Sequence, residues 1–214
     1  MTMKIAIIGA GNVGGTLGSR WAKNGHTVTF GVRNPGDEKL KKLLSSAGGT
    51  ARAATISDAV KDASVIVLAT PWEGAQSAIQ AAGKLAGKIL IDATNPLTMS
   101  PEGLRLVLGH TTSAGEQVAS WASGARLVKA FNTTGAKNMA DPKFGSQSAS
   151  MFVCGDDAEA RATVMKLADE LGFEAVDCGA LSSARYLEPM AMLWIHLCVG
   201  LGRGPDFAFK IVKR

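Results

Sequence analysis

The feature that most constrains this sequence is a glycine-rich turn near its N-terminus. The apolar run KIAII leads directly into GAGNVG, and a helical pattern follows. We expect Gly9 to make a sharp turn, Gly11 to let a pyrophosphate approach the backbone and Gly14 to let the helix pack on the strand. Asn12 and Val13 are then expected at the start of a helix, where their backbone amides favour the binding of an anion. The turn therefore predicts a dinucleotide site.

Short apolar runs alternate with helical patterns along most of the chain. Several runs are continuous (IAIIG, VIVLA, ILID), which is typical of strands that are covered on both faces. This alternation predicts an α/β fold of the Rossmann type, a doubly wound, mostly parallel sheet with a short C-terminal helical extension. The predicted strands are Lys4–Ile8, Thr27–Val32, Val65–Ala69, Ile89–Asp92, Leu127–Phe131, Ser150–Cys154 and Glu174–Asp177. The predicted helices are Val13–Asn24, Glu38–Ala47, Ser57–Ala63, Glu73–Leu85, Glu116–Ala122 and Ala158–Leu171.

The end of the second strand indicates which dinucleotide binds. An NAD site carries Asp or Glu there to bind the ribose hydroxyls. In this chain TVTFG is followed by Val32, Arg33 and Asn34, and no carboxylate appears before Asp37. A carboxylate would repel a 2′-phosphate, whereas the planar guanidinium of Arg33 can pair with it. We therefore predict NADP(H) rather than NAD(H), with cofactor contacts from all three residues.

Loops that follow the later strands supply the other expected cofactor contacts, because ligands lie beyond the carboxyl edge of such a sheet. Thr70, Pro71 and Trp72 follow the strand VIVLA and should pass beneath the cofactor. Trp72 either stacks on a ring of the ligand or fills the core. Asn95, in a turn before Pro96, should direct a polar group into the crevice.

The strand LVKAF should bring a second group of residues to the crevice. Ala130 is small enough for close approach of a nicotinamide, and Asn132 can hold the carboxamide or the substrate. Asp92, at the end of ILID, is interpreted as a hydrogen-bond acceptor that fixes its loop rather than as an acid catalyst.

The sequence offers no convincing acid–base pair. Its single tyrosine, Tyr186, is followed four residues later by Met190, which excludes a dehydrogenase of the Tyr-x-x-x-Lys kind. Lys137 is a candidate proton donor, but Asp141 stands where a Lys-x-x-x-Asn motif requires asparagine. His196 is either a pocket donor or a structural histidine. We therefore assign no catalytic residue and, because the histidines and cysteines lack ligand spacing, no metal site.

Net charge and cysteine usage indicate which partners and which cellular compartment to expect. The net charge of +5 favours anionic partners, but Lys and Arg form no long run beyond the KLKK segment. Phosphorylated small molecules are therefore expected rather than nucleic acid. Three cysteines without a C-x-x-C pair suggest reduced thiols. The late apolar stretch Pro189–Gly202 is too short to span a bilayer, and no signal peptide is recognised. We expect a cytoplasmic protein without a membrane partner.

The C-terminal segment differs from the rest of the chain. Apolar residues surround the pattern from Leu187 to Leu201 instead of forming one stripe, which predicts a helix buried on every side. Either it is simply the last core helix, or a second copy of the chain covers it in a homodimer. We divide the chain into an NADP-binding domain with a sheet extension (1–179) and a helical segment (180–214) for the acceptor site and dimer contact. The acceptor is expected in an open cleft formed by Pro71–Trp72, Asn95–Pro96, Ala130–Asn132 and Leu187–Gly202.

Six stretches of the sequence resemble one family. GAGNVG, GVRNP, ATPWE, VKAFNT, VCGDD and the tail LEPMAMLWIHL…GLGRGPDFAFK are similar to the NADP oxidoreductases dependent on coenzyme F420. The resemblance covers nearly the whole chain. It implies hydride transfer between NADPH and a deazaflavin coenzyme, and a similar domain is the flavin-reducing part of membrane metalloreductases. It also implies that Ala10 to Val13 cradle the pyrophosphate, that Val32 and Arg33 meet the 2′-phosphate and that Ala130 lies near the nicotinamide.

These observations predict an NADPH-dependent oxidoreductase that passes hydride directly to F420 or a flavin-like acceptor. In such chemistry the cofactors carry the reaction and the protein supplies orientation. Two alternatives stay open. One is an imine or carbonyl reductase, which needs a proton donor such as Lys137 or His196. The other is an NADP(H)-binding redox sensor without turnover.

Overall fold

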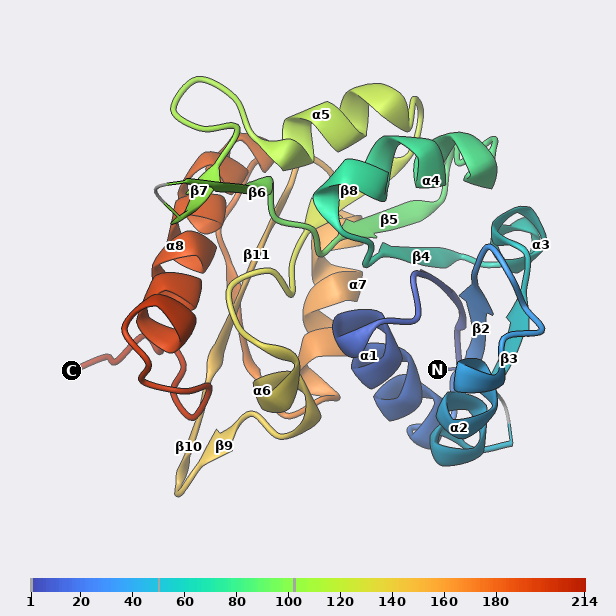
Figure 1. Cartoon of the computed structure of the whole chain (residues 1–214), viewed down its shortest axis with the longest axis horizontal. Helices are drawn as coiled ribbons and strands as arrows, with labels where there is room; N and C mark the ends of the chain where they lie inside the picture. The colour runs from blue at the N-terminus through green and yellow to red at the C-terminus, as the bar shows by residue number, and fades with distance from the viewer. Residues whose placement is uncertain (1, 50, 102) are drawn as a thin grey trace.

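The alternating runs form one eight-stranded sheet with helices on both faces (Figure 1). The computed structural model describes residues 2–49, 51–101 and 103–214. The strands of this sheet are β1 (Lys4–Ile8), β2 (Thr27–Gly31), β3 (Ala51–Ala54), β4 (Val65–Leu68), β5 (Ile89–Asp92), β8 (Arg126–Lys129), β11 (Ser150–Gly155) and β12 (Glu174–Asp177). Two hairpins lie outside it, formed by β6 (Leu97–Ser100) with β7 (Gly103–Leu106) and by β9 (Lys143–Phe144) with β10 (Gln147–Ser148).

The strand order is β12-β11-β8-β5-β4-β1-β2-β3. Neighbouring strands are parallel except β8 and β11, which are antiparallel. The run from β3 to β8 has the doubly wound order, with its reversal between β1 and β4. The predicted Rossmann-type, mostly parallel fold is therefore confirmed.

The helices form two layers because each central strand buries alternate side chains on opposite faces. Ile5 and Ile7 of β1 pack under one layer, whereas Ala6 and Ile8 pack under the other. The first layer includes α1 (Asn12–Lys23), α2 (Glu38–Ala47), α6 (Ala136–Ala140) and α7 (Ala158–Asp169). The second layer includes α3 (Ile56–Lys61), α4 (Ala75–Ala82) and α5 (Ala114–Trp121).

Some short elements escaped the sequence prediction. The edge strand β3, both hairpins and α6 were not expected, because two to five residues carry too little periodicity to identify an element. The helix expected over Glu73–Leu85 is in fact a 3₁₀ turn, Trp72–Gly74, followed by α4. It ends at Gly83, whose φ of 72° stops the helix.

The C-terminal segment folds back on the sheet after α8 (Ala184–Ile195). A π-helical turn, His196–Gly200, extends α8, and the chain then reverses. The indole N–H of Trp194 donates to the carbonyl of Phe207 at 3.0 Å, and their rings stack with centroids 5.3 Å apart. Farther along, the amide of Ser150 in β11 donates to the carbonyl of Phe209 at 3.0 Å. These contacts hold the tail beside β11.

The prediction that the C-terminal helix is buried on every side is wrong for the single chain. Leu187 and Trp194 are buried, but Tyr186 is 74% exposed and Leu193 is 49% exposed. α8 lies at the flank of the sheet (Figure 1), and the described part of the chain leaves these apolar side chains uncovered. Among the described residues, no helix combines the length and apolar character needed to cross a bilayer. All three cysteines are free thiols.

Candidate functional site

The glycine turn follows β1 and opens α1 at the carboxyl edge of the sheet. A Cβ on Gly9, where φ is 102°, would lie 2.7 Å from the carbonyl oxygen of Ala69. A Cβ on Gly14 would lie only 2.0 Å from the carbonyl oxygen of Gly9. Around Gly11, in contrast, nothing lies within 4 Å of the Cβ position. Packing therefore requires the first and third glycines, whereas the second leaves an open approach to the backbone.

The N-terminus of α1 is left free for an anion. Gly11 is its N-cap, so no side chain satisfies the first amides, and the first turn contains no acidic residue. Exposed amides at the positive end of a twelve-residue helix attract a negatively charged group. The half-buried Ala10 completes this turn.

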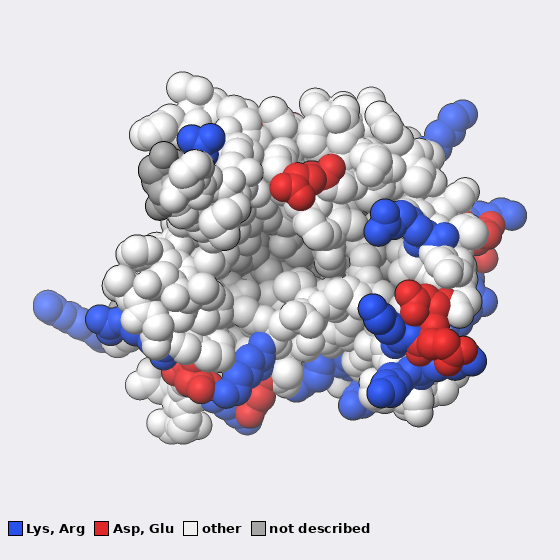
Figure 2. All heavy atoms as spheres, in the orientation of Figure 1, with Lys and Arg blue, Asp and Glu red and all other residues white. Residues whose placement is uncertain are grey.

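A cleft of about 380 Å³ opens beside this turn. The hollow visible at the centre of Figure 2 is bordered mostly by uncharged atoms, with one group of acidic atoms above it, while many Lys and Arg side chains lie toward the side where Figure 1 labels α2 and β3. Seven of the residues predicted from sequence line the cleft, namely Gly11, Asn12, Val13, Thr70, Pro71, Trp72 and Asn95. Ala69, Glu73, Ala93, Thr94 and Leu97 also line it and were not predicted.

Val32, Arg33 and Asn34 follow β2, outside the residues that line this cleft. The amide of Gly9 donates to the carbonyl of Gly31 at 3.2 Å, which places the end of β2 beside the glycine turn. Arg33 is exposed, and within the described chain no carboxylate lies at ion-pair distance from it. The side chain of Asn34 instead accepts from the amide of Gly36 at 3.1 Å and fixes the loop.

Trp72 has contacts on both the core and the cleft. Its ring stacks on Trp121 of α5, with centroids 5.4 Å apart and an interplanar angle of 27°. Trp72 therefore packs against the cluster beneath α4 and α5, and it also lines the cleft. Next to it, the buried hydroxyl oxygen of Thr70 has no hydrogen-bond partner.

Asn95 and Asn132 form a reciprocal amide pair at the ends of β5 and β8. Asn95 Nδ2 donates to the carbonyl of Asn132 at 3.0 Å, and Asn132 Nδ2 donates to Asn95 Oδ1 at 3.1 Å. Asn132 Nδ2 also donates to the carbonyl of Leu187 in α8 at 3.2 Å. Asn132 Oδ1 is buried without a partner, and Asn132 does not itself line the cleft, whereas Asn95, to which it is hydrogen-bonded, does. Ala130 is fully buried behind this pair.

Phe131, between Ala130 and Asn132, adopts φ of 61°, which is unusual for a bulky residue. Its buried ring makes edge-on contacts with Trp21 at 5.5 Å and with Phe173 at 6.5 Å. Packing in the core thus holds a strained backbone at the edge of the sheet.

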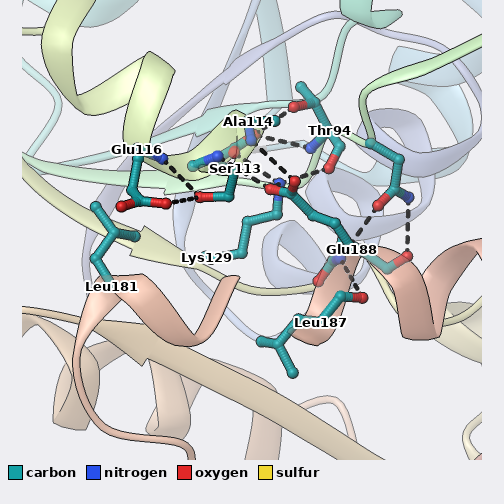
Figure 3. A network of polar contacts seen from close by, with 12 residues as sticks. Thr94, Ser113, Ala114, Glu116, Lys129, Leu181, Leu187 and Glu188 are labelled. Atoms are coloured by element: carbon teal, nitrogen blue, oxygen red, sulfur yellow. Dashed lines mark hydrogen bonds and ion pairs between the residues drawn. The ribbon is translucent and has the colours of Figure 1, made fainter. Parts of the chain in front are cut away.

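A buried charge cluster that was not predicted contacts Thr94 of the cleft lining, and Figure 3 shows two of its members, Lys129 and Glu188. Lys129 Nζ lies 2.8 Å from Asp92 Oδ2 and 2.9 Å from Glu188 Oε1, and all three side chains are at most 1% exposed. Burial alone would lower the pKa of Lys129, but the two carboxylates outweigh it and raise that pKa. The ammonium is therefore charged. We call these three residues the buried triad.

A signal for the buried triad existed in the sequence. Lys129 interrupts the apolar strand LVKAF and Glu188 interrupts an apolar helix, and a buried charge requires a partner of opposite charge. Asp92 Oδ1 does fix its loop as expected, because it accepts from the amide of Thr94 at 2.9 Å and from its hydroxyl at 2.7 Å. What the sequence could not show is which buried charges meet.

The two candidate proton donors are not held for catalysis. Lys137 is 62% exposed and pairs with Asp206 at 2.5 Å. His196 is exposed in the π-helical turn, where a Cβ on Gly200 would lie 2.9 Å from its Nδ1.

Comparisons with known proteins show which family this chain resembles. Residues 4–96 match the family described as NADP oxidoreductase coenzyme F420-dependent. The F420-dependent NADP reductase of Methanocaldococcus jannaschii is 31% identical over 207 residues, which cover 91% of this chain and 92% of that protein. A solved structure from Arthrobacter sp. FB24, provisionally named an F420-dependent NADP reductase, is 36% identical with a TM-score of 0.90, and the alignment covers 99% of this chain and 100% of that chain. The chain belongs to this family.

As a member of the F420-dependent NADP oxidoreductase family, the protein is an NADP-dependent oxidoreductase. The rat metalloreductase STEAP3 is also similar, at 33% identity over 190 residues. This match covers 88% of the present chain but only 36% of STEAP3, so the chain corresponds to one part of that longer protein. Family membership thus establishes the reaction class.

Proposed function

We propose that the protein transfers hydride directly between NADP(H) and a deazaflavin (F420) or flavin-like acceptor. The observation that carries this proposal is a cleft with a free helix N-terminus and uncharged inner walls, beside which the buried ammonium is already neutralised by carboxylates. Within the described lining, Glu73 is the single ionisable side chain, and it is exposed. When bound, NADPH supplies the hydride. The chain itself binds and orients the two rings.

The residues present fit NADP(H). The amides of Asn12 and Val13 at the uncapped start of α1 would hold the pyrophosphate, and the open side of Gly11 lets it approach. The unpaired guanidinium of Arg33 would hold the 2′-phosphate, with Val32 and Asn34 beside it. Gly9 and Ala10 shape the turn beneath these groups.

The nicotinamide end is assigned to the other side of the cleft. Asn132 Oδ1, which is buried without a partner, would accept from the carboxamide, and Asn95 holds Asn132 in place. Thr70, Pro71 and Trp72, which follow β4 and line the cleft, would border the ring. Ala130 lies behind it without occupying space in the cleft.

The acceptor is assigned to the open side of the cleft, toward the helical segment 180–214, although no residue of that segment is among those that line the cleft. An open site with uncharged walls suits a flat ring system that stacks, whereas a small substrate would need closer enclosure.

The structure does not favour the imine or carbonyl reductase. That reaction needs a proton donor at the substrate, whereas Lys137 is paired at the surface and His196 is exposed. A redox sensor would bind NADP(H) at the same site but would not transfer hydride to an acceptor. The assay below distinguishes it from the proposed enzyme.

Oxidation of NADPH should be followed by its absorbance with F420, FMN, FAD and a panel of small imines. Turnover with F420 or a flavin is the expected result. Turnover with imines alone would instead establish the reductase alternative. Tight NADPH binding without oxidation by any acceptor would refute the proposed reaction and establish the sensor.

We also propose that a second copy of the chain covers the exposed apolar periphery of the C-terminal segment. Tyr186, Leu193, Val199 and Leu201 are between 49% and 75% exposed on this segment. Large apolar side chains gathered on one element are typical of an interface. Reduced, free thiols support the cytoplasm as the site of action.

A further inference from the structure

Lys129 has no donor left for a ligand. Its three N–H groups reach Asp92 Oδ2 at 2.8 Å, the carbonyl of Thr94 at 2.7 Å and Glu188 Oε1 at 2.9 Å. An ammonium has three donors and no acceptor, so its hydrogen bonding is complete. Both the missing donor and the complete burial exclude proton transfer to a substrate. Its role is to hold other groups.

Glu188 joins three elements that are distant in sequence. Besides Lys129 of β8, its carboxylate accepts from the amides of Ala114 at 2.8 Å and Gly115 at 3.0 Å, at the N-terminus of α5. Charge-assisted hydrogen bonds of this kind are short and directional. Figure 3 shows Glu188 reaching from α8 into this group. The position of α8 is therefore fixed against both β8 and α5.

The buried triad is also connected to the cleft lining. Thr94 donates to Asp92 from its amide and its hydroxyl, and Thr94 and Asn95 line the cleft. On the other side, the carbonyl of Leu187, directly before Glu188, accepts from Asn132. The edge where we place the nicotinamide and the helix where we place the acceptor are thus connected through one buried network.

We propose that Glu188 and Lys129 are positioning residues that set the distance between α8 and the nicotinamide edge of the cleft. This inference rests on the proposed function. Hydride transfer requires reacting atoms about 3–3.5 Å apart, and a misplacement of about 1 Å costs on the order of 100-fold in rate. A helix released from the triad would still fold against the protein but would no longer hold the acceptor at that distance.

Two variants test the proposal from opposite directions. Glu188→Gln keeps the size of the side chain. Both carboxylate oxygens of Glu188 accept from N–H groups, so the NH₂ group of glutamine would face a donor and lose a hydrogen bond. Glu188→Asp keeps the charge and shortens the reach. In both, kcat for the acceptor should fall about 10- to 100-fold. The Kd for NADPH should stay within about twofold, because other elements supply its predicted contacts.

The matched control is Glu116→Gln. Glu116 pairs with Arg185 at 2.5 Å and so joins the same two helices, α5 and α8, but it contacts neither Lys129 nor Thr94. We expect its kcat to remain within about twofold of the unmodified protein. A comparable loss in this control would mean that any link between the helices suffices, and it would overturn the specific role of the triad.

Hydrogen exchange of the α8 amides gives a second readout that does not depend on turnover. We expect exchange at 184–195 to rise about tenfold or more in both Glu188 variants, with β1 and β2 unchanged. Unchanged α8 exchange together with unchanged kcat would overturn the proposal, as would an equal rise across the sheet. If the unmodified protein oxidises no NADPH with any acceptor, the proposed function fails, and exchange with NADPH affinity then decides positioning. If Glu188→Gln does not fold, Glu188→Asp, with its charge intact, decides the question.

Discussion

The substitution Arg33→Ala tests the prediction that the protein binds NADP(H) rather than NAD(H). In the protein the guanidinium has no ion-pair partner among the described residues, so its removal should change the free energy of unfolding by no more than about 0.5 kcal/mol. The 2′-phosphate of NADPH carries about −1.5 to −2 charges near neutral pH. The substitution should therefore affect this ligand group specifically.

The expected magnitude follows from the exposure of Arg33. A hydrogen bond to a charged group contributes about 1.5–3 kcal/mol, and an exposed pair belongs at the lower end, about 1.5–2 kcal/mol. At about 1.4 kcal/mol per factor of ten, the Kd for NADPH should rise roughly 10- to 30-fold. The Kd for NADH, which lacks the phosphate, should stay within about twofold.

Calorimetric titration of both dinucleotides at low and at raised salt measures this difference. The loss for NADPH should shrink as salt increases, because screening weakens the pair in the unmodified protein. Lys39→Ala removes an exposed positive charge from nearby α2 and is the control for the general surface field. An unchanged Kd for NADPH, equal losses for both dinucleotides, or an equal effect in the control would refute the reasoning.

Three further predictions follow from the geometry. Gly11→Ala should fold with unchanged Tm yet bind NADPH at least about tenfold more weakly, because nothing surrounds its Cβ position in the free protein. Gly14→Ala should lower Tm, because its Cβ would clash with the carbonyl of Gly9. Scanning calorimetry measures Tm, and calorimetric titration measures the Kd for NADPH. Burial raises the pKa of Cys154 from 9.0 to about 12, so the unfolded thiol ionises first as pH rises. Ionisation of this thiol should lower the free energy of unfolding by about 1.4 kcal/mol between pH 8 and 10. Denaturant titrations should show that Cys154→Ala lacks this decrease, although the variant is less stable than the unmodified protein at pH 7. Light scattering should find a dimer that Leu193→Glu converts to a folded monomer, and a monomeric unmodified protein would contradict the proposed interface.

Much of the fold could be predicted because its signals are local. The spacing of Gly9, Gly11 and Gly14 and the continuous apolar strands belong to short segments, and β5 and β12 occur at their predicted residues. The short edge strand β3 was missed because four residues paired with one neighbour need no strong pattern. Trp72 shows a related difficulty, since composition cannot tell a ring that faces a ligand from one that stacks on Trp121.

The sequence by itself determined the doubly wound sheet, the dinucleotide turn and the absence of a carboxylate after β2. Each depends on backbone conformation or burial within one short segment, which residue type and spacing control directly. Only the tertiary structure decided that Lys129, Asp92 and Glu188 meet, that Asn132 keeps an unpartnered oxygen, and that one side of α8 stays exposed. These facts depend on how segments far apart in the chain pack together. A charged residue within an apolar segment indicates that a buried partner of opposite charge is needed, but only the folded chain determines which residue that partner is.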